Sequence, residues 1–234
     1  MPDSIERALE AALSDRCCLG QILIQKTNDG FVLCHRADEA RKDLQTSRNA
    51  EEAVEIAKYD DAGNYRPLKT APNLRHGWRL TLKTLEELKR ALDYFYPGRL
   101  AVFATWKTTQ LRTTNLRDTL DRQSGMYRVA AKISDAQIDD LVADFCRSDG
   151  GCLRTILWKR DAHGTVSSTK LPNEKFDPMF DQTKALARSG SSAFAEATAD
   201  KTTPATATIP LLCQEPCNLL VAECRKVVTG ARAR

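Results

Sequence analysis

Four cysteines in the second half of the chain are spaced as two pairs that could hold a metal. Cys213 and Cys217 form a C-x3-C pair, and Cys146 and Cys152 form a C-x5-C pair about sixty residues earlier. Cysteine thiolates are ligands of both iron–sulfur clusters and structural zinc ions. Four thiolates therefore fit either kind of site. The spacing by itself also allows four buried thiols, because free cysteine is among the most buried residue types.

The elements predicted around these cysteines place them where helices and strands begin or end. Pro216 directly precedes Cys217, and proline favours the first turn of a helix, where its missing N–H costs nothing. A helix that begins at Cys217 would direct unpaired N–H groups and a positive dipole end at the thiol, which favours the thiolate. Cys146 ends a predicted helix whose cap is Ser134, and Cys152 begins a predicted strand after two glycines. Both pairs can therefore lie at one end of a domain core.

The remaining cysteine of the C-terminal segment, Cys224, is predicted to pack in the core. In a helix that begins at Cys217, Cys224 shares an apolar face with Leu220 and Val221. It would lie about 10 Å from Cys217 along the helix axis, which is too far for a shared mononuclear site. Cys34 falls inside a predicted strand, where a core role is also expected.

The rest of the sequence predicts an α+β fold. Helical periodicity or caps indicate helices over residues 4–14, 49–58 and 81–98, the last stopped by Pro-Gly. An Asn-Asp-Gly turn at 28–30 separates two apolar runs and predicts a β-hairpin. The apolar run at 100–106 predicts a strand.

We expect two small packed α+β domains, residues 1–121 and residues 122–234, with the four-cysteine site in the second. Residues 185–208 are rich in Ala, Ser and Thr and poor in large apolar side chains. Such a composition is typical of a flexible, disordered insertion rather than of a core.

Composition and charge exclude several classes of function. The chain carries 35 Lys plus Arg against 31 Asp plus Glu, and a net charge of +4 is too small to indicate nucleic-acid binding. No stretch approaches the roughly 20 apolar residues that cross a bilayer, so no membrane partner is expected. The charged N-terminus lacks the apolar centre of a signal peptide. We therefore expect a cytoplasmic, reducing location, in which cysteines are thiols or metal ligands before they are disulfides.

Four segments together carry a resemblance to a known family: "LKTAPNLRHGW", "QSGMYR", "CLRTILW" and "PCNLLVAECR". They resemble the C-terminal half of multidomain sirohydrochlorin cobaltochelatase-like proteins, in which CbiX-type chelatase domains are followed by a stabilising domain and a 4Fe-4S cluster-binding domain. Residues up to about 121 match the stabilising part and the remainder matches the cluster part.

The resemblance implies a [4Fe-4S] iron–sulfur cluster with four ligands, Cys146, Cys152, Cys213 and Cys217. It implies an accessory protein with an electron-transfer or redox-sensing role, beside a separate CbiX-type chelatase or another protein of tetrapyrrole and cobalamin biosynthesis. The alternative is a structural module in which the same four cysteines bind Zn²⁺ and no redox chemistry occurs.

Catalysis by this chain alone is not expected, because the chelatase domains are absent from the sequence. The three histidines, His35, His76 and His163, form no pair that could bind cobalt during insertion, so each is predicted to be a surface or hydrogen-bonding residue. A thiol enzyme is disfavoured too, since Cys34 and His35 are adjacent on a predicted strand and would point to opposite faces.

Overall fold

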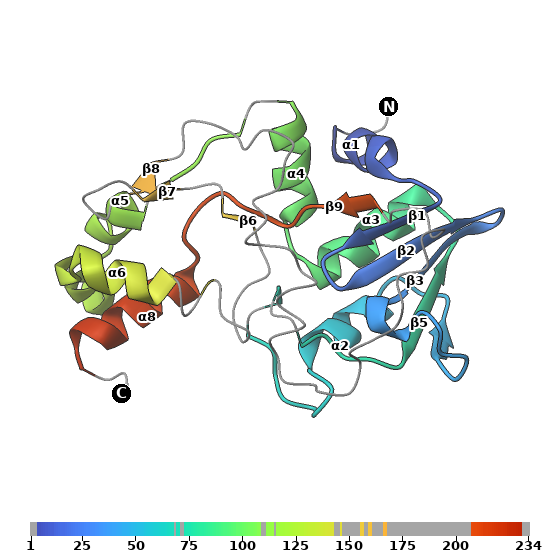
Figure 1. Cartoon of the computed structure of the whole chain (residues 1–234), viewed down its shortest axis with the longest axis horizontal. Coiled ribbons are helices and arrows are strands. Elements are labelled where there is room, and N and C mark those ends of the chain that lie inside the picture. The colour runs from blue at the N-terminus through green and yellow to red at the C-terminus, as the bar shows by residue number, and fades with distance from the viewer. Residues whose placement is uncertain are drawn as a thin grey trace, which may run out of the picture.

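The structure contains a sheet covered by helices at one end and a smaller helical group at the other (Figure 1). It is a computed structural model, and the residues that it describes are 4–67, 69–70, 73–108, 111–114, 116–142, 146, 155–156, 159–160, 166–167 and 207–230. Helices and strands both contribute to this part of the chain, so the predicted α+β class is confirmed.

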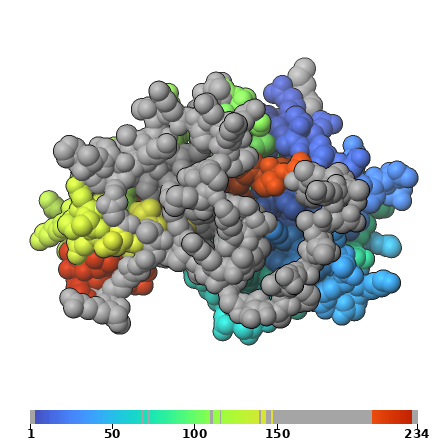
Figure 2. All heavy atoms as spheres, viewed as in Figure 1, coloured from blue at the N-terminus to red at the C-terminus, as the bar shows by residue number. Residues whose placement is uncertain are grey.

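The sheet has six strands and draws them from both halves of the chain. In spatial order they are β4 (Gln45–Ser47), β5 (Trp78–Leu82), β3 (Gly30–His35), β2 (Ile22–Thr27), β1 (Arg16–Leu19) and β9 (Ala207–Ile209). The β1–β2, β2–β3 and β3–β5 pairs are antiparallel, whereas β4 runs parallel to β5 and β9 runs parallel to β1. Figure 2 shows β9, in orange, against the blue N-terminal segment.

The β2–β3 hairpin is the one that the Asn-Asp-Gly sequence predicts. Thr27 pairs with Gly30 across the two-residue turn. Gly30 has a φ of 134°, a backbone conformation that residues with a Cβ rarely adopt. A Cβ at this position would also lie 2.1 Å from the backbone oxygen of Leu82 on β5. Glycine is therefore needed both for the turn and for the close approach of the next strand.

Four helices cover one face of the sheet and enclose the larger core. They are α1 (Ser4–Ala12), α2 (Glu52–Lys58), α3 (Leu85–Phe95) and α4 (Arg99–Lys107). Alternate strand residues face this layer: Ile22 and Ile24 join the large core, while Leu23 joins Cys34 and Leu44 in a small cluster of its own. Each fully buried leucine or isoleucine contributes about 2 kcal/mol relative to an exposed one.

The predicted strand at 100–106 is wrong, because this segment is helix α4. Leu100, Phe103 and Trp106 recur at three-residue spacing and are buried in the large core. Val102 and Ala104 are buried as well, so almost every position of the segment is apolar or covered. An apolar run without clear alternation fits a helix and a strand equally, and packing against α1 decides between them here.

The second core is formed by short helices from the middle of the chain and by the C-terminal helix. These are α5 (Leu116–Asp121), the 3-10 helix η2 (Gly125–Lys132), α6 (Asp135–Leu141) and α8 (Asn218–Val228). The predicted Ser134 cap is confirmed: the N–H of Gln137 donates to Ser134 Oγ at 3.3 Å, and the N–H of Ser134 donates to Gln137 Oε1 at 3.0 Å.

Two small strand pairs complete the described elements. The strands β6 (Thr155–Ile156) and β10 (Leu212–Cys213) pair in parallel, and β7 (Lys159–Arg160) pairs antiparallel with β8 (Val166–Ser167). A 3-10 helix, η1 (Arg36–Asp38), follows β3 directly.

The predicted C-terminal boundary of the insertion at 185–208 is two residues too far along the chain. Its last two residues, Ala207 and Thr208, belong to β9, because the exposed edge of β1 offers them hydrogen-bonding partners. The rest of the insertion lies outside the described residues, and the domain boundary between residues 121 and 122 stays a prediction.

Within the described part of the chain, every helix is too short or too polar to cross a lipid bilayer.

We predict that Gly30→Ala lowers the free energy of unfolding by more than about 1 kcal/mol, because it adds a steric clash to an unfavourable φ. Gly63→Ala is the matched control: Gly63 also has a positive φ, 79°, but a Cβ there meets nothing within 4 Å. Chemical denaturation measures both. Equal losses in the two variants would contradict the proposed contact with Leu82.

A second prediction concerns the cap of α3. Thr84 Oγ1 accepts a hydrogen bond from the N–H of Glu87, and the Glu87 carboxylate accepts one from the N–H of Thr84. Thr84→Ala removes one half of this capping box and should cost about 1 kcal/mol of stability. Thr105→Ala removes a half-buried hydroxyl that only donates to the backbone oxygen of Ala101 within α4, and it should change stability by less than about 0.5 kcal/mol. A thermal melt that ranks the two variants in the opposite order would refute the cap.

Candidate metal centre

Cys217 stands at the start of α8, as the sequence predicts. It is the N-cap residue, with a φ of −81° and a ψ of 161°. Its Sγ accepts a hydrogen bond from the backbone N–H of Leu220 at 3.4 Å. The sulfur therefore lies among the N–H groups that begin the helix, which can donate hydrogen bonds to it.

Cys213 lies four residues earlier, on β10. Its side chain is buried, and its Sγ donates to the backbone oxygen of Glu215 at 3.2 Å. The turn between the two cysteines is anchored to the segment before α5, because the N–H of Thr114 donates to the backbone oxygen of Gln214 at 3.2 Å. This C-x3-C pair therefore occupies a turn that is fixed at a strand end, at a helix start and at a contact with the second core.

Cys146 packs in the same core as this pair. It is buried in the second cluster together with Cys213, and Cys217 packs against that cluster. The other buried members come from the four helical elements and include Leu116, Leu120, Ala130, Ile133, Ile138, Leu141, Leu220, Val221 and Cys224. Three of the four cysteines that the sequence predicts as ligands thus pack in or against one core, and their binding of one cluster stays a prediction.

The fourth predicted ligand, Cys152, lies outside the described residues. The segment that follows it is described in part: Thr155 and Ile156 form β6, which pairs with Leu212 and Cys213 of β10. The chain just after Cys152 and the chain that leads into the C-x3-C pair are therefore neighbouring strands.

Arg117 holds together the helices around these cysteines. Its guanidinium group donates to the backbone oxygens of Ala131 and Ile133 at 3.0 and 3.1 Å, and to the carboxylate of Asp135 at 3.0 Å. These bonds satisfy the last carbonyl groups of η2 and connect α5 to the start of α6. The walls of the centre are therefore fixed by a charged side chain as well as by apolar packing.

Cys224 belongs to packing, as predicted. It is fully buried on α8, and burial raises its pKa to about 12, so it is a neutral thiol at physiological pH. Cys34 is buried in the small cluster on the other face of the sheet, and burial raises its pKa to about 11. Burial raises the pKa values of Cys17 and Cys18 on β1 as well. Burial and these raised pKa values favour a packing role for these four cysteines.

The prediction that the histidines form no pair is wrong. His35 and His76 lie with their ring centroids 3.8 Å apart, and Asp38 completes a group whose potential ligand atoms all lie within 4.8 Å of one another. The pairing was missed because 41 residues separate the two histidines, and only the β3–β5 pairing brings them together. The nearest signal in the sequence is the short His35-x-x-Asp38 spacing on one turn.

The surroundings of this group shift two pKa values. Burial and the neighbouring His76 lower the pKa of His35 to about 3. Burial works to raise the pKa of Asp38, but the hydrogen bond from the Gly77 N–H and the contact with His76 outweigh it and lower that pKa. The third histidine, His163, lies outside the described residues.

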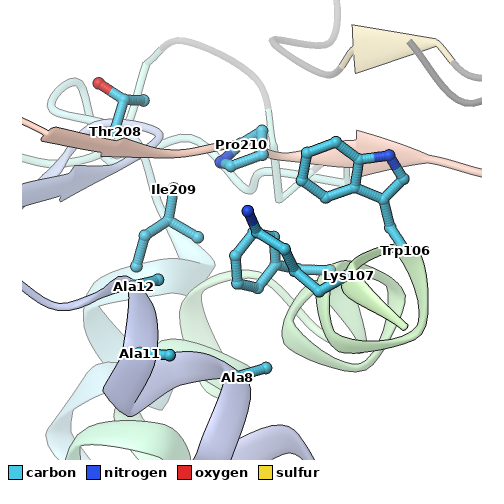
Figure 3. Close-up of a pocket in the computed structure, with 9 residues that line it drawn as sticks. Ala8, Ala11, Ala12, Trp106, Lys107, Thr208, Ile209 and Pro210 are labelled. Carbon is cyan, nitrogen blue, oxygen red and sulfur yellow. The ribbon is translucent and has the colours of Figure 1, made fainter. Parts of the chain in front are cut away.

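A hollow of about 410 Å³ lies on the large core (Figure 3). Small side chains of α1, among them Ala8 and Ala12, face Trp106 and Lys107 of α4, and β9 closes the hollow with Ile209. The Lys107 ammonium lies 5.1 Å from the centroid of the Trp106 ring. None of the four predicted cysteine ligands lines this hollow among the described residues.

Comparison with known proteins gives two family matches and a structural likeness. Residues 6–110 match the DR2241 stabilising domain, and residues 108–226 match the 4Fe-4S iron-sulfur cluster binding domain. No curated protein matches the chain.

The crystal structure of DR2241 from Deinococcus radiodurans resembles this one with a TM-score of 0.71 at 24% sequence identity. That protein is described as a multi-domain protein with structural similarity to chelatases and with two additional novel domains. The likeness covers 97% of the present chain but only 41% of DR2241, and it shows a shared fold.

The cluster-domain match contains Cys146, Cys152, Cys213 and Cys217, and it supports the iron–sulfur cluster binding that the resemblance implies. The order of a stabilising domain followed by a cluster domain is also confirmed. Because the second match spans more than half of the chain, the protein belongs to the family of the 4Fe-4S iron-sulfur cluster binding domain.

Proposed function

We propose that this chain binds its [4Fe-4S] cluster through Cys146, Cys152, Cys213 and Cys217 and uses it for electron transfer or redox sensing. The observation that carries the ligand assignment is the shared core of Cys146, Cys213 and Cys217. These three cysteines come from segments about seventy residues apart and pack in or against this core, inside the range that matches the cluster-binding family. When bound, the cluster supplies a one-electron redox couple.

The position of Cys152 in the sequence supports its place in this ligand set. Three residues of chain reach at most about 10 Å, and Thr155 is three residues after Cys152. Thr155 pairs with Leu212, the residue before Cys213, so the length of chain after Cys152 is compatible with the proposed ligand role.

The local environment supports a redox role. The Leu220 N–H already donates to Cys217 Sγ, and hydrogen bonds of this kind to ligand sulfurs are among the factors that set a cluster's reduction potential. Cys146 and Cys213 are buried, so that side of the centre is shielded from water. Low exposure disfavours added negative charge and so lowers the potential.

The proposed partner is a separate CbiX-type chelatase or another protein of tetrapyrrole and cobalamin biosynthesis, in a cytoplasmic, reducing compartment. The support is the likeness to DR2241, which is described as structurally similar to chelatases. This chain shares the fold of 41% of the DR2241 chain. Cluster-bound cysteines also suit a reducing compartment, because oxidation to disulfides would remove the ligands.

Anaerobically purified chain should contain about four iron and about four acid-labile sulfide per molecule. Each single serine variant of the four proposed ligands should lower this content and bleach the broad visible absorption, because serine is a much poorer ligand for iron. Iron and sulfide analysis of Cys146→Ser, Cys152→Ser, Cys213→Ser and Cys217→Ser measures this.

Cys224→Ala is the matched control, because Cys224 lies in the same core but packs as a neutral thiol. It should retain the full iron content and melt at a lower temperature. If Cys224→Ala lost the cluster while Cys217→Ser kept it, the ligand assignment would be wrong. One zinc and no iron per chain would replace the redox role with a structural one.

The redox role predicts a reversible one-electron reduction of the loaded protein in an anaerobic spectroelectrochemical titration. Cys217→Ala should show no such reduction, whereas Cys18→Ser, on the half-buried strand β1, should leave the midpoint potential unchanged.

The partner is tested by sedimentation of the loaded chain with a CbiX-type chelatase, where a complex is expected. A chain that sediments alone would refute the proposed partner, and a cluster that cannot be reduced would refute the redox role.

A further inference from the structure

Two histidines and an aspartate meet at one edge of the large core, far in sequence from the cysteine centre. His35 ends β3 and is the N-cap residue of η1, on which Asp38 lies three residues later. His76 comes from the segment just before β5, the strand that pairs with β3. His35 and Asp38 are each only 2% exposed, whereas His76 is half-buried.

The Asp38 carboxylate is fixed between these segments. Its Oδ2 accepts a hydrogen bond from the N–H of Gly77 at 2.7 Å, and its Oδ1 lies 3.1 Å from His76 Nδ1. Arg41 approaches the same Oδ1 more loosely, at 3.5 Å, and its better contact is with Asp43 at 3.0 Å. The carboxylate is therefore held mainly through its Oδ2 by the backbone of Gly77, which leaves Oδ1 directed at His76.

His76 lies between two carboxylates. In addition to the Nδ1–Asp38 contact, its Nε2 lies 3.4 Å from Asp61 Oδ2. Asp61 is itself held, because its other oxygen accepts a hydrogen bond from the backbone N–H of His76. A neutral imidazole has one N–H and can donate to only one of the two carboxylates. In the tautomer whose Nε2–H donates to Asp61, the Nδ1 lone pair faces Asp38 Oδ1, so a cation between these two atoms can bind both.

His35 adds a buried ring nitrogen whose hydrogen-bonding capacity is unused. Its Nε2 has no hydrogen-bond partner among the described residues, although the side chain is almost fully buried. Its Nδ1 accepts a hydrogen bond of 3.2 Å from the N–H of Ala37. An unsatisfied polar atom in the interior is unfavourable, and such an atom beside a carboxylate and a second imidazole indicates a missing ligand.

We propose that His35, Asp38 and His76 form a binding site for a divalent first-row transition-metal ion, with Asp61 orienting His76. Two imidazoles and one carboxylate are ligands that suit Zn²⁺, Co²⁺ and Fe²⁺. Two ligand atoms at about 2.1 Å from one ion are about 3.0–3.4 Å apart, which agrees with the observed 3.1 Å between Asp38 Oδ1 and His76 Nδ1. The carboxylate–histidine–metal arrangement, with Asp61 on the second ring nitrogen, is the usual way in which a ligating histidine is oriented.

Ion binding changes one hydrogen bond in a way that can be measured. If the ion binds His35 Nδ1, it displaces the Ala37 N–H. If it binds Nε2, the ring proton moves to Nδ1, and Ala37 again loses its acceptor. In either case the Ala37 N–H must find another acceptor or remain without one, so its amide resonance reports on the site. This site uses no cysteine and is independent of the proposed cluster.

The test is equilibrium dialysis of the anaerobic, cluster-loaded chain against micromolar Co²⁺, followed by elemental analysis. We expect one cobalt per chain in addition to the iron. His76→Ala should weaken cobalt binding at least tenfold, and Asp61→Asn should weaken it less, because it removes only the orienting contact. Titration with diamagnetic Zn²⁺ should shift the Ala37 amide resonance in the wild type and leave it unchanged in His76→Ala.

Two controls separate this site from the cysteines and from misfolding. Asp43→Asn changes an exposed carboxylate near the site and should retain cobalt, and Cys217→Ser should lose iron but keep cobalt. Circular dichroism and a thermal melt verify that His76→Ala is folded. Absence of cobalt in the wild type, equal binding by folded His76→Ala, or loss of cobalt in Cys217→Ser would each overturn the proposal.

Discussion

The structure depends on residues 209–213, a short segment that belongs to both cores. Ile209, Leu211 and Leu212 are buried in the large core beneath the sheet, whereas Cys213 is buried in the second core. The segment therefore passes from the large core to the second core between Leu212 and Cys213 and packs in both. Arg99, at the start of α4, donates to the backbone oxygen of Leu212 at 3.0 Å and adds a polar link at the same place. The position of Cys213 is therefore set by packing that belongs largely to the other half of the molecule.

This constraint gives the stabilising half a physical role in the cysteine centre. β9 pairs with β1 and fixes where the chain leaves the sheet, β10 pairs with β6, and α8 then begins at Cys217. Without the sheet as an anchor, bringing the C-x3-C pair to Cys146 would require closing a loop of some seventy residues, and the closure entropy grows with loop length. Pairing in the sheet and between β6 and β10 already restricts this part of the chain, so much of the closure entropy is lost on folding, before a cluster binds.

The chain contains two groups of potential metal ligands that differ in chemistry and in location. The cysteine centre lies in the helical second core and offers thiolates, which suit iron–sulfur clusters. The His35, Asp38 and His76 group lies where β3 ends and β5 begins, and it offers nitrogen and oxygen atoms. Each is positioned by a different long-range pairing, β6 with β10 for the first and β3 with β5 for the second. The two can therefore be loaded and tested separately.

The sequence by itself determined those features that depend on neighbouring residues. The hairpin at Asn28-Asp29, the Ser134 cap, the helix start at Cys217 and the packing role of Cys224 all follow from local turn chemistry or helical spacing, and all are present. Tertiary structure decided the rest. The run at 100–106 is helical because α1 and the core cover it, residues 207–208 are a strand because β1 leaves an edge open, and His35 meets His76 because β3 pairs with β5. Composition and periodicity describe a single segment, whereas these three outcomes depend on which distant segment lies beside it.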